Sequence, residues 1–260
     1  MARQKRRRAP QPVPPPLPPE TRTVGQLVAE TIRFYGSRFW HSLALGIAPA
    51  AAGLAIAESP GVARLGLALT VGAIAASLSY ALATGLVAGK RIPRKQLAEA
   101  TAFGTITLAP AIVLLGFLGL LGLLPAVIWL GFAGLIVPVI TLEGRRSFSR
   151  TFELARADLM HAIGSLATLA LVGLLTAYVL FFTLRSAGTA ALRASAFVSV
   201  LVISPLLFLG AALLYNDQLA RVGSTPRRRR PDADVHPAVQ PDRPGRSDAQ
   251  VEPGPAARGQ

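Results

Sequence analysis

Residues 101–142 read TAFGTITLAPAIVLLGFLGLLGLLPAVIWLGFAGLIVPVITL and contain no charged side chain. As a single α-helix they would extend about 63 Å, because each residue adds about 1.5 Å along the axis. The hydrocarbon core of a bilayer is only about 30 Å thick, so roughly 20 apolar residues cross it as a helix. The segment therefore predicts two membrane-spanning helices that fold back on each other, with the turn at Gly119–Pro125.

Further apolar blocks flank this pair, and the whole chain is 52% hydrophobic but only 15% charged. Such a composition is too apolar for an ordinary soluble domain. We therefore expect an all-α fold, namely a polytopic transmembrane helical bundle of about six spans. The four additional spans are expected at Ser42–Ala57, Leu65–Ala88, about 163–184 and about 194–215.

The expected domains are a helical membrane domain over residues 21–222 and a disordered tail on each side of it. The N-terminal tail, residues 1–20, is basic and then proline-rich, so it lacks the apolar region of a secretory signal. The C-terminal tail, residues 223–260, is rich in proline, arginine and aspartate. It has few large apolar residues with which to form a core, and we expect it to be cytoplasmic and disordered.

The basic residues indicate how the spans are oriented, because Lys and Arg predominate on the cytoplasmic side of membrane proteins. Six spans with both termini in the cytoplasm place all 27 lysines and arginines on that side except Arg64, Arg185 and Arg193. Basic clusters on both sides of residues 101–142 also require an even number of crossings there. We therefore expect both termini to be cytoplasmic.

The formal net charge of +14 would suggest a nucleic-acid partner in a soluble protein. Here the cations flank apolar blocks, which favours anionic lipid headgroups as partners and argues against nucleic acid. The chain has no cysteine and only three histidines, far apart in sequence. This excludes disulfides, thiolate zinc sites and cysteine nucleophiles, and we expect neither a metal nor another cofactor.

Between two apolar blocks lies an amphipathic segment, residues 139–164, reading VITLEGRRSFSRTFELARADLMHAIG. From Ser147, a plausible N-cap, apolar residues recur at helical spacing on one face. Arg150, Glu153 and Arg156 fall away from that face. We expect a helix that lies in the membrane interface, with aromatic side chains in the membrane surface and arginines at the headgroups. The apolar face comprises Phe148, Phe152, Ala155, Leu159 and Ile163.

A similar amphipathic segment, TVGQLVAETIRFYGSRFW (residues 23–40), precedes the first span. Thr23 and Gln26 have the spacing of a capping box. Both segments enter a span through an apolar residue and a histidine, His41 and His161, which lie 120 positions apart in sequence. The offset is compatible with an internal repeat and equally with chance similarity between apolar segments.

The candidate functional residues follow from this arrangement. Glu143, at the end of a span, is expected to pair with Arg145, Arg146 or Arg150 and so fix the amphipathic helix against the bundle. A catalytic role for Glu143 is the alternative, but no second carboxylate, nucleophile or metal ligand accompanies it. The arginines expected to contact lipid headgroups are Arg145, Arg146, Arg150, Arg156, Arg227, Arg228, Arg229 and Arg230.

The segments TVGQLVAETIRFYGSRFW, PVITLEG and FSRTFELARADLMHAIG resemble a bacterial integral-membrane family. That family includes the membrane domain attached to some glycerophosphodiester phosphodiesterases and stand-alone members without an assigned activity. The resemblance covers about residues 21–221 and implies a six-helix membrane module with no established chemistry. Thr151 departs from the usual Ser, and Asp158 stands where a basic or small residue is common. The matching residues are Pro138, Glu143, Gly144, Arg150, Thr151, Phe152 and Leu154.

These observations favour a multi-pass protein of the bacterial inner membrane that is not an enzyme. Its expected role is to organise lipid, or a partner, at the cytoplasmic membrane face; the partner could be a second copy or another membrane protein. The alternative is a transporter or permease-like component for an amphipathic or lipid-like solute. Four prolines within or beside spans motivate that alternative, because each frees a backbone carbonyl and can bend its helix. They are Pro49, Pro110, Pro138 and Pro205.

Overall fold

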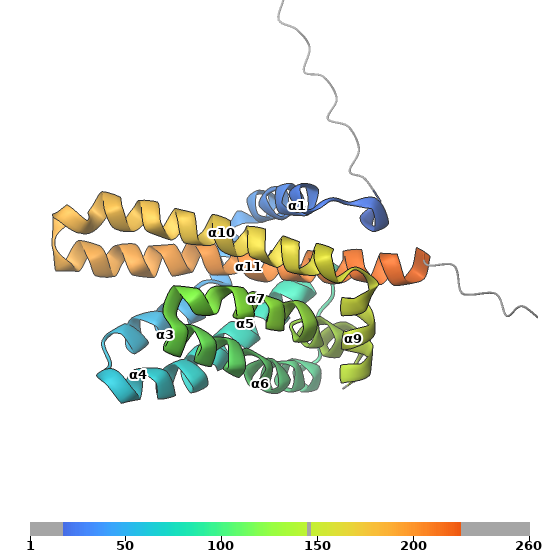
Figure 1. The fold of residues 1–260 in the computed structure, drawn as a ribbon, viewed down its shortest axis with the longest axis horizontal. Coiled ribbons are helices and arrows are strands. Elements are labelled where there is room, and N and C mark those ends of the chain that lie inside the picture. The colour runs from blue at the N-terminus through green and yellow to red at the C-terminus, as the bar shows by residue number, and fades with distance from the viewer. Residues whose placement is uncertain (1–17, 145–146, 225–260) are drawn as a thin grey trace, which may run out of the picture. The chain divides into compact units, whose positions relative to one another are not determined.

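The computed structural model describes residues 18–144 and 147–224 (Figure 1). Within these residues the chain is helical and forms no strand, which confirms the all-α prediction. The N-terminal residues 1–17, the pair Arg145 and Arg146, and residues 225–260 with Arg227–Arg230 lie outside the described part. The predictions made for them therefore stay predictions.

Helices follow one another with short connections. In chain order they are η1 (Pro19–Thr21), α1 (Val24–Ser37), α2 (Phe39–Ala44), α3 (Ile47–Ala57), α4 (Gly61–Leu67), η2 (Ala68–Gly72), α5 (Ala73–Ala88), α6 (Arg94–Leu118), η3 (Gly119–Gly122), α7 (Leu123–Ala133), α8 (Ile136–Pro138), η4 (Val139–Glu143), α9 (Phe148–Ala157), α10 (Leu159–Leu184), η5 (Arg185–Ala187) and α11 (Thr189–Ser224). Among the described residues, five continuous helical stretches are long and apolar enough to cross a membrane. These are Phe39–Ala57, Gly61–Ala88, Arg94–Glu143, Leu159–Leu184 and Thr189–Gly223.

The third stretch folds back on itself, as predicted. The indole Nε1 of Trp129 donates a hydrogen bond of 2.8 Å to the carbonyl of Thr107. In a straight helix, these two residues would lie about 33 Å apart. Gly119 (φ 56°, ψ −132°) makes the turn in a backbone conformation that L-residues avoid. The stretch therefore contributes two antiparallel limbs, and the described bundle has six apolar limbs.

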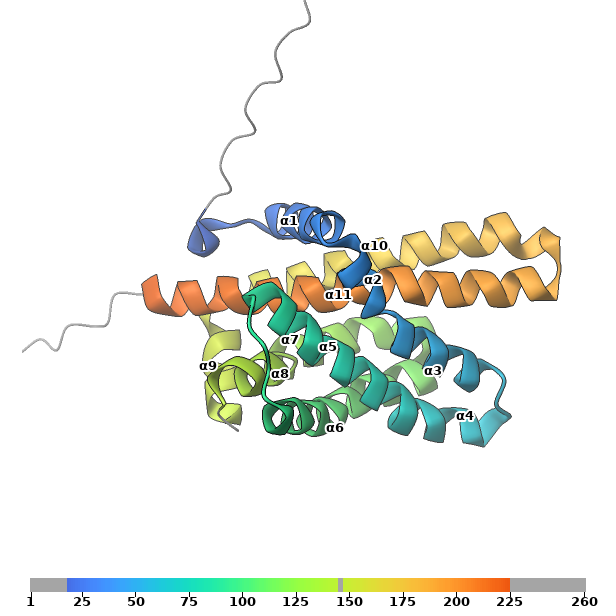
Figure 2. The ribbon, with the colours of Figure 1, turned by 180° about the vertical axis from the view of Figure 1, so that it is seen from behind.

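The limbs alternate in direction, so the connections gather at two ends (Figures 1 and 2). The terminal end carries η1, the 89–93 loop, the start and end of α9, and the end of α11. The hairpin end carries the connections at 58–60, 119–122 and 185–188. Ion pairs join segments within each end, Arg22 to Asp217 at the terminal end and Arg193 to Glu58 at the hairpin end.

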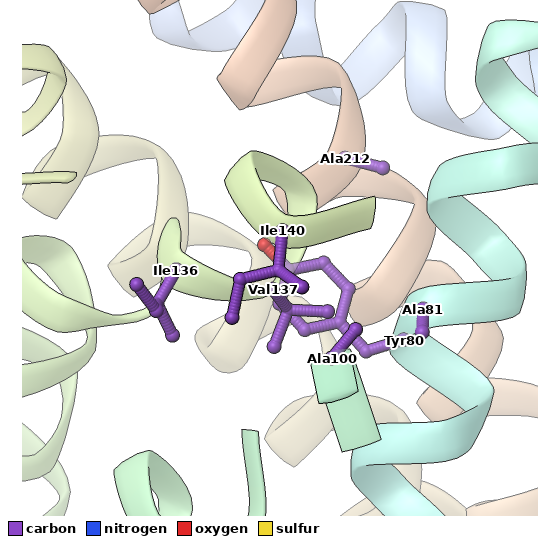
Figure 3. Packing of buried hydrophobic residues seen from close by; sticks show 7 residues of the cluster. All are labelled: Tyr80, Ala81, Ala100, Ile136, Val137, Ile140 and Ala212. Atoms are coloured by element: carbon purple, nitrogen blue, oxygen red, sulfur yellow. The ribbon is translucent and has the colours of Figure 1, made fainter. Parts of the chain in front are cut away.

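The centre of the bundle forms where α5, α6, α8 and α11 meet (Figure 3). Val137 and Ile140 lie against the ring of Tyr80, and alanines at 81, 100 and 212 let the helices approach closely. Small residues at helix contacts are typical of bundles in membranes, where close van der Waals packing replaces the hydrophobic driving force.

Two amphipathic helices, α1 and α9, run crosswise to α10 and α11 near the terminal end (Figures 1 and 2). We call them the elbow helices. The predicted caps are confirmed. The backbone N–H of Thr23 donates to Gln26 Oε1 at 2.8 Å while the Thr23 hydroxyl accepts from the Gln26 N–H, and Ser147 Oγ accepts the Arg150 N–H. Each elbow buries one face against the spans: Leu27 and Thr31 of α1, and Thr151, Leu154 and Ala155 of α9.

The helix boundaries differ from the sequence expectation at several places. The α9 helix ends at Ala157, because Asp158 (φ −156°) caps a new helix, so Leu159 and Ile163 belong to α10. The predicted first span is divided at Leu45 and Gly46 into α2 and α3. At the chain's described limits, η1 begins at Pro19, and α11 continues to Ser224, beyond the boundary expected at residue 222.

Gly46, at the break between α2 and α3, packs against α11. Pro205 has no backbone N–H, so the carbonyl of Leu201, one turn earlier, loses its helical donor. Gly46 packs directly on that carbonyl; a Cβ added at Gly46 would lie 2.0 Å from the Leu201 oxygen. Only a residue without a side chain allows this approach. The first span therefore packs closely against the last at the carbonyl that Pro205 leaves without its helical donor.

We predict that Gly46→Ala destabilises the protein by about 1–3 kcal/mol, the usual cost of overpacking a well-packed contact. For a domain of this size, this corresponds to a fall in Tm of roughly 2–12 °C. Thermal unfolding of the purified protein in detergent measures it. Gly36→Ala in α1 is the matched control, because a Cβ there has no atom within 4 Å. An equal loss in both variants would contradict the proposed contact.

Candidate functional site

A buried ion pair lies at the terminal end. Asp217 of α11 is fully buried, and its Oδ1 accepts a hydrogen bond of 2.8 Å from Nη1 of Arg22, whose side chain is 11% exposed. Arg22 belongs to the short link between η1 and α1, 195 residues away in sequence. A carboxylate without a partner in such a place would cost several kcal/mol. The pair therefore fixes the start of the first elbow helix to α11.

The second oxygen of Asp217 faces His161, near the start of α10. His161 Nε2 lies 3.6 Å from Asp217 Oδ2, and neither atom has a hydrogen-bond partner among the described residues. The distance is slightly too long for a hydrogen bond, and the imidazole side chain is only 6% exposed. Asp217 thus lies between the guanidinium of Arg22 and the imidazole of His161, which are far apart in the sequence.

Asp158 holds a second group of contacts beside the first. Its Oδ1 accepts the backbone N–H of His161 at 2.9 Å, as an N-cap of α10, and its Oδ2 accepts from Nη1 of Arg221. The carbonyl of Asp158 accepts from Gln218 Nε2 at 3.0 Å. A carboxylate at a helix N-terminus also gains from the helix dipole. Asp158 therefore stabilises the start of α10 and binds it to α11.

Arg221 closes the network. Its Nη2 donates a hydrogen bond of 2.7 Å to the backbone carbonyl of Arg22. One connected set of side chains thus joins the entry to α1, the junction between α9 and α10, and the end of α11. We call this set the clasp. It comprises Arg22, Asp158, His161, Asp217, Gln218 and Arg221.

The clasp has the geometry of a structural lock. Asp217 and Gln218 are fully buried, and none of the described hollows is lined by a clasp residue. Among the described residues, no group of three His, Asp or Glu side chains is placed to hold a metal ion.

A second polar contact group forms around Glu143, which lies at the end of η4. Its Oε1 accepts a hydrogen bond of 2.8 Å from the Tyr215 hydroxyl and lies 3.5 Å from Nε of Arg150. Arg150 also donates from Nη1 to Glu153 at 2.9 Å. Glu143 therefore connects the end of η4 to both α9 and α11, and Arg150 is the arginine that lies beside it among the described residues.

Of the arginines expected to contact lipid headgroups, Arg150 and Arg156 lie in the described part of the chain. Their surroundings differ. The hydrogen bond to Glu153, together with the carboxylate of Glu143, raises the pKa of the Arg150 guanidinium, so its charge is permanent but compensated by two acids. Arg156 is exposed. It lines a shallow surface hollow on α9 together with Ser149, Phe152 and Glu153. Of the two, Arg156 is the side chain with access to an external anion.

Apolar side chains project outward close to the elbow helices. Trp40 is 76% exposed and Met160 is 80% exposed, and each stands where an elbow helix leads into a span. Phe148 and Phe152 of α9 are also exposed. Aromatic residues are enriched at membrane–water interfaces, where their rings pack at headgroup level. The terminal end therefore presents aromatic rings beside its basic residues.

An apolar hollow lies between the α6–α7 pair and the α10–α11 pair. Its inner part is a cavity of about 280 Å³ that reaches from Leu115 to Leu214. A groove of about 510 Å³ continues it toward the hairpin end. The two share Leu115, Leu123, Ala170 and Leu207. Among the described residues that line the hollow none is charged, so its surface suits hydrocarbon rather than a polar solute.

The sequence pattern singles out Glu143 and Arg150 but does not predict the clasp. It marks His161 only as a residue at the entry to a span, and Asp158 only as a departure from the family pattern. The available signal is that Asp158 and Asp217 each stand at the edge of an apolar block. Periodicity within one segment, however, does not reveal which distant arginine will meet which acid.

Comparison with known proteins gives no match, whether to family models, to curated proteins or to solved structures.

We predict that Arg22→Gln and Asp217→Asn each destabilise the protein by about 3 kcal/mol, because each leaves a buried partner without its counter-charge. The fall in Tm should be roughly 6–12 °C. The double variant should lose less than the sum of the two, as a double-mutant cycle in detergent would measure.

The matched control is the exposed pair of α1, in which Arg33 donates to Glu30 at 3.0 Å. The variants Arg33→Gln and Glu30→Gln should each cost no more than about 1 kcal/mol. Additive losses in the Arg22 and Asp217 cycle would show that the two side chains are not energetically coupled.

Proposed function

We propose that this chain is a multi-pass protein of the bacterial inner membrane that organises lipid, or a partner, at the cytoplasmic face and is not an enzyme. Both termini are cytoplasmic in this proposal, so the terminal end faces the cytoplasm. Phospholipids are the principal partners; nucleic acid and cofactors have no part in it. The resemblance to the membrane domain of glycerophosphodiester phosphodiesterases points to the same kind of module.

The observation that carries the proposal is the position of the elbow helices. Both lie crosswise near one end of the bundle, outside the apolar stretches, and each is held by a buried face. A helix in this orientation with exposed aromatics suits the interfacial plane of a bilayer. The ion pairs at Asp217 and Glu143 make the arrangement rigid, so the headgroup-facing surface is preformed.

Electrostatic attraction to anionic headgroups supplies the selectivity in this proposal. Arg156 is the exposed described arginine of α9, and Arg227–Arg230 follow α11 closely in sequence. Each cation near an anionic leaflet contributes about 1 kcal/mol at moderate ionic strength. Several cations together are therefore sufficient to enrich anionic lipid around the terminal end.

A transporter for a lipid-like solute is the second candidate. The apolar hollow between the two helix pairs favours it, because Pro110 of α6 and Pro205 of α11 both lie in helices that line the hollow. The absence of charge among the described lining residues directs this candidate away from ions and sugars. Any solute that it moves would be largely hydrocarbon.

The orientation can be tested by labelling, because the chain has no natural cysteine. Ser149 of α9 and Ser186 of η5 are both exposed, and they lie at opposite ends of the bundle. In intact cells, a membrane-impermeant maleimide should label Ser186→Cys and leave Ser149→Cys unlabelled until the cells are permeabilised. Labelling of Ser149→Cys from outside would overturn the proposed orientation.

Headgroup selectivity can be tested in lipid nanodiscs that contain equal amounts of phosphatidylglycerol and phosphatidylcholine. Native mass spectrometry should show preferential retention of phosphatidylglycerol by the full-length protein. Replacing Arg156 and Arg227–Arg230 with glutamine should lower the retention ratio about fivefold or more, since a single cation contributes about 1 kcal/mol.

The control is Arg185→Gln, which removes a cation at the hairpin end. It should leave the phosphatidylglycerol preference of the terminal end in place. Equal retention of the two lipids by the unmodified protein, or an equal effect of Arg185→Gln, would contradict the proposal.

A further inference from the structure

The apolar hollow has a closed end and an open end. Toward the terminal end its lining residues Leu135, Val137 and Leu214 are at least nine-tenths buried. Toward the hairpin end Leu120 is 68% exposed and Leu174 is 39% exposed. The hollow is therefore a blind channel whose mouth faces the surroundings of the bundle near the hairpin end.

The length of the channel can be measured along α11. The residues of α11 that line the channel extend from Ser199 to Leu214. Fifteen residues of helix correspond to about 22 Å. One leaflet contributes about half of a 30 Å hydrocarbon core. The channel is therefore long enough for one extended lipid chain.

The volume of the channel limits its occupant. The cavity holds about 280 Å³ and the groove about 510 Å³. A dry apolar cavity of about 150 Å³ accommodates benzene, so on that scale the inner cavity alone has room for roughly ten carbon atoms.

The lining chemistry selects an uncharged occupant. The hydroxyls of Thr107 and Ser199 donate to carbonyls of their own helices at 2.8 Å and 2.6 Å. The buried hydroxyl of Ser204 in the groove has no hydrogen-bond partner among the described residues, so it is the one hydroxyl of the three that is left without a bond within its own helix. The described lining residues carry no charge. A methylene chain loses no hydrogen bond on entering such a channel, whereas a polar solute would.

We propose that this channel binds a single acyl chain of a membrane lipid, which enters through the mouth near the hairpin end with its methyl terminus toward Leu214. The inference rests on the proposed membrane location but not on headgroup binding by the terminal-end arginines. The site recognises hydrocarbon, and the headgroup stays outside the channel.

The test uses the full-length protein purified in detergent, with phosphatidylcholines of increasing saturated chain length as probes. Native mass spectrometry should detect one tightly retained lipid. Each additional methylene that the channel buries should strengthen retention about fourfold, until the channel is filled. Exchanging the headgroup for phosphatidylglycerol should leave this chain-length dependence unchanged.

The decisive variant is Ala170→Phe, because Ala170 lines both the cavity and the groove. The added ring should lower retention at least tenfold. Leu207→Trp blocks the same region from α11 and serves if the first variant fails to fold. Ala102→Phe, an exposed position of α6 that lies outside the channel, is the matched control and should retain lipid normally.

Three results would overturn the proposal. Retention that Ala170→Phe and Leu207→Trp leave unchanged would place the lipid elsewhere. Retention that depends on headgroup but not on chain length would favour the terminal-end arginines alone, and the proposed function would survive without the channel. Loss of a protein dimer, rather than of lipid, in Ala170→Phe would show that a second copy covers this face.

Conversely, retention that depends on chain length but shows no preference for anionic lipid would support the channel. The same result would count against headgroup selectivity at the terminal end.

Discussion

Burial of the Asp217 carboxylate is the constraint on which the terminal end depends. A fully buried acid on α11 needs a counter-charge, and Arg22 supplies it from the opposite end of the sequence. Once Arg22 is held there, its carbonyl accepts from Arg221, and Arg221 in turn reaches Asp158 at the start of α10. Asp217 is thus connected to the entry of α1 directly, and to the start of α10 through Arg22, Arg221 and Asp158.

The two ends of the bundle differ in their chemistry. At the terminal end, polar side chains are buried in pairs and the helices are tied to one another. Toward the hairpin end, the α6–α7 and α10–α11 pairs separate enough to leave an apolar hollow. A bundle clasped at one end and open along one side at the other combines a rigid surface with a lining able to adapt. Lipid contact at both places is consistent with such a division.

Much of the fold could be predicted from the sequence, because apolar length and charge are local properties. The length of residues 101–142 required a hairpin, and the Trp129–Thr107 contact confirms it. The caps at Thr23 and Ser147 followed from residue type and spacing. The close contact of Gly46 with the freed carbonyl of Leu201 could not be foreseen, since Leu201 lies on a helix about 150 residues later. The Arg22–Asp217 pair was missed for the same reason: long-range partners leave no periodic signal.

The span of the clasp in sequence has a consequence for biogenesis. Arg22 and Asp217 are separated by 195 residues, so at 5–20 residues per second Arg22 waits about 10–40 s for its partner during synthesis. Until α11 emerges, the Arg22 guanidinium lacks the Asp217 carboxylate with which it pairs in the folded chain. Closure of the clasp is therefore a late step of assembly, because Asp217, Gln218 and Arg221 all belong to the last helix.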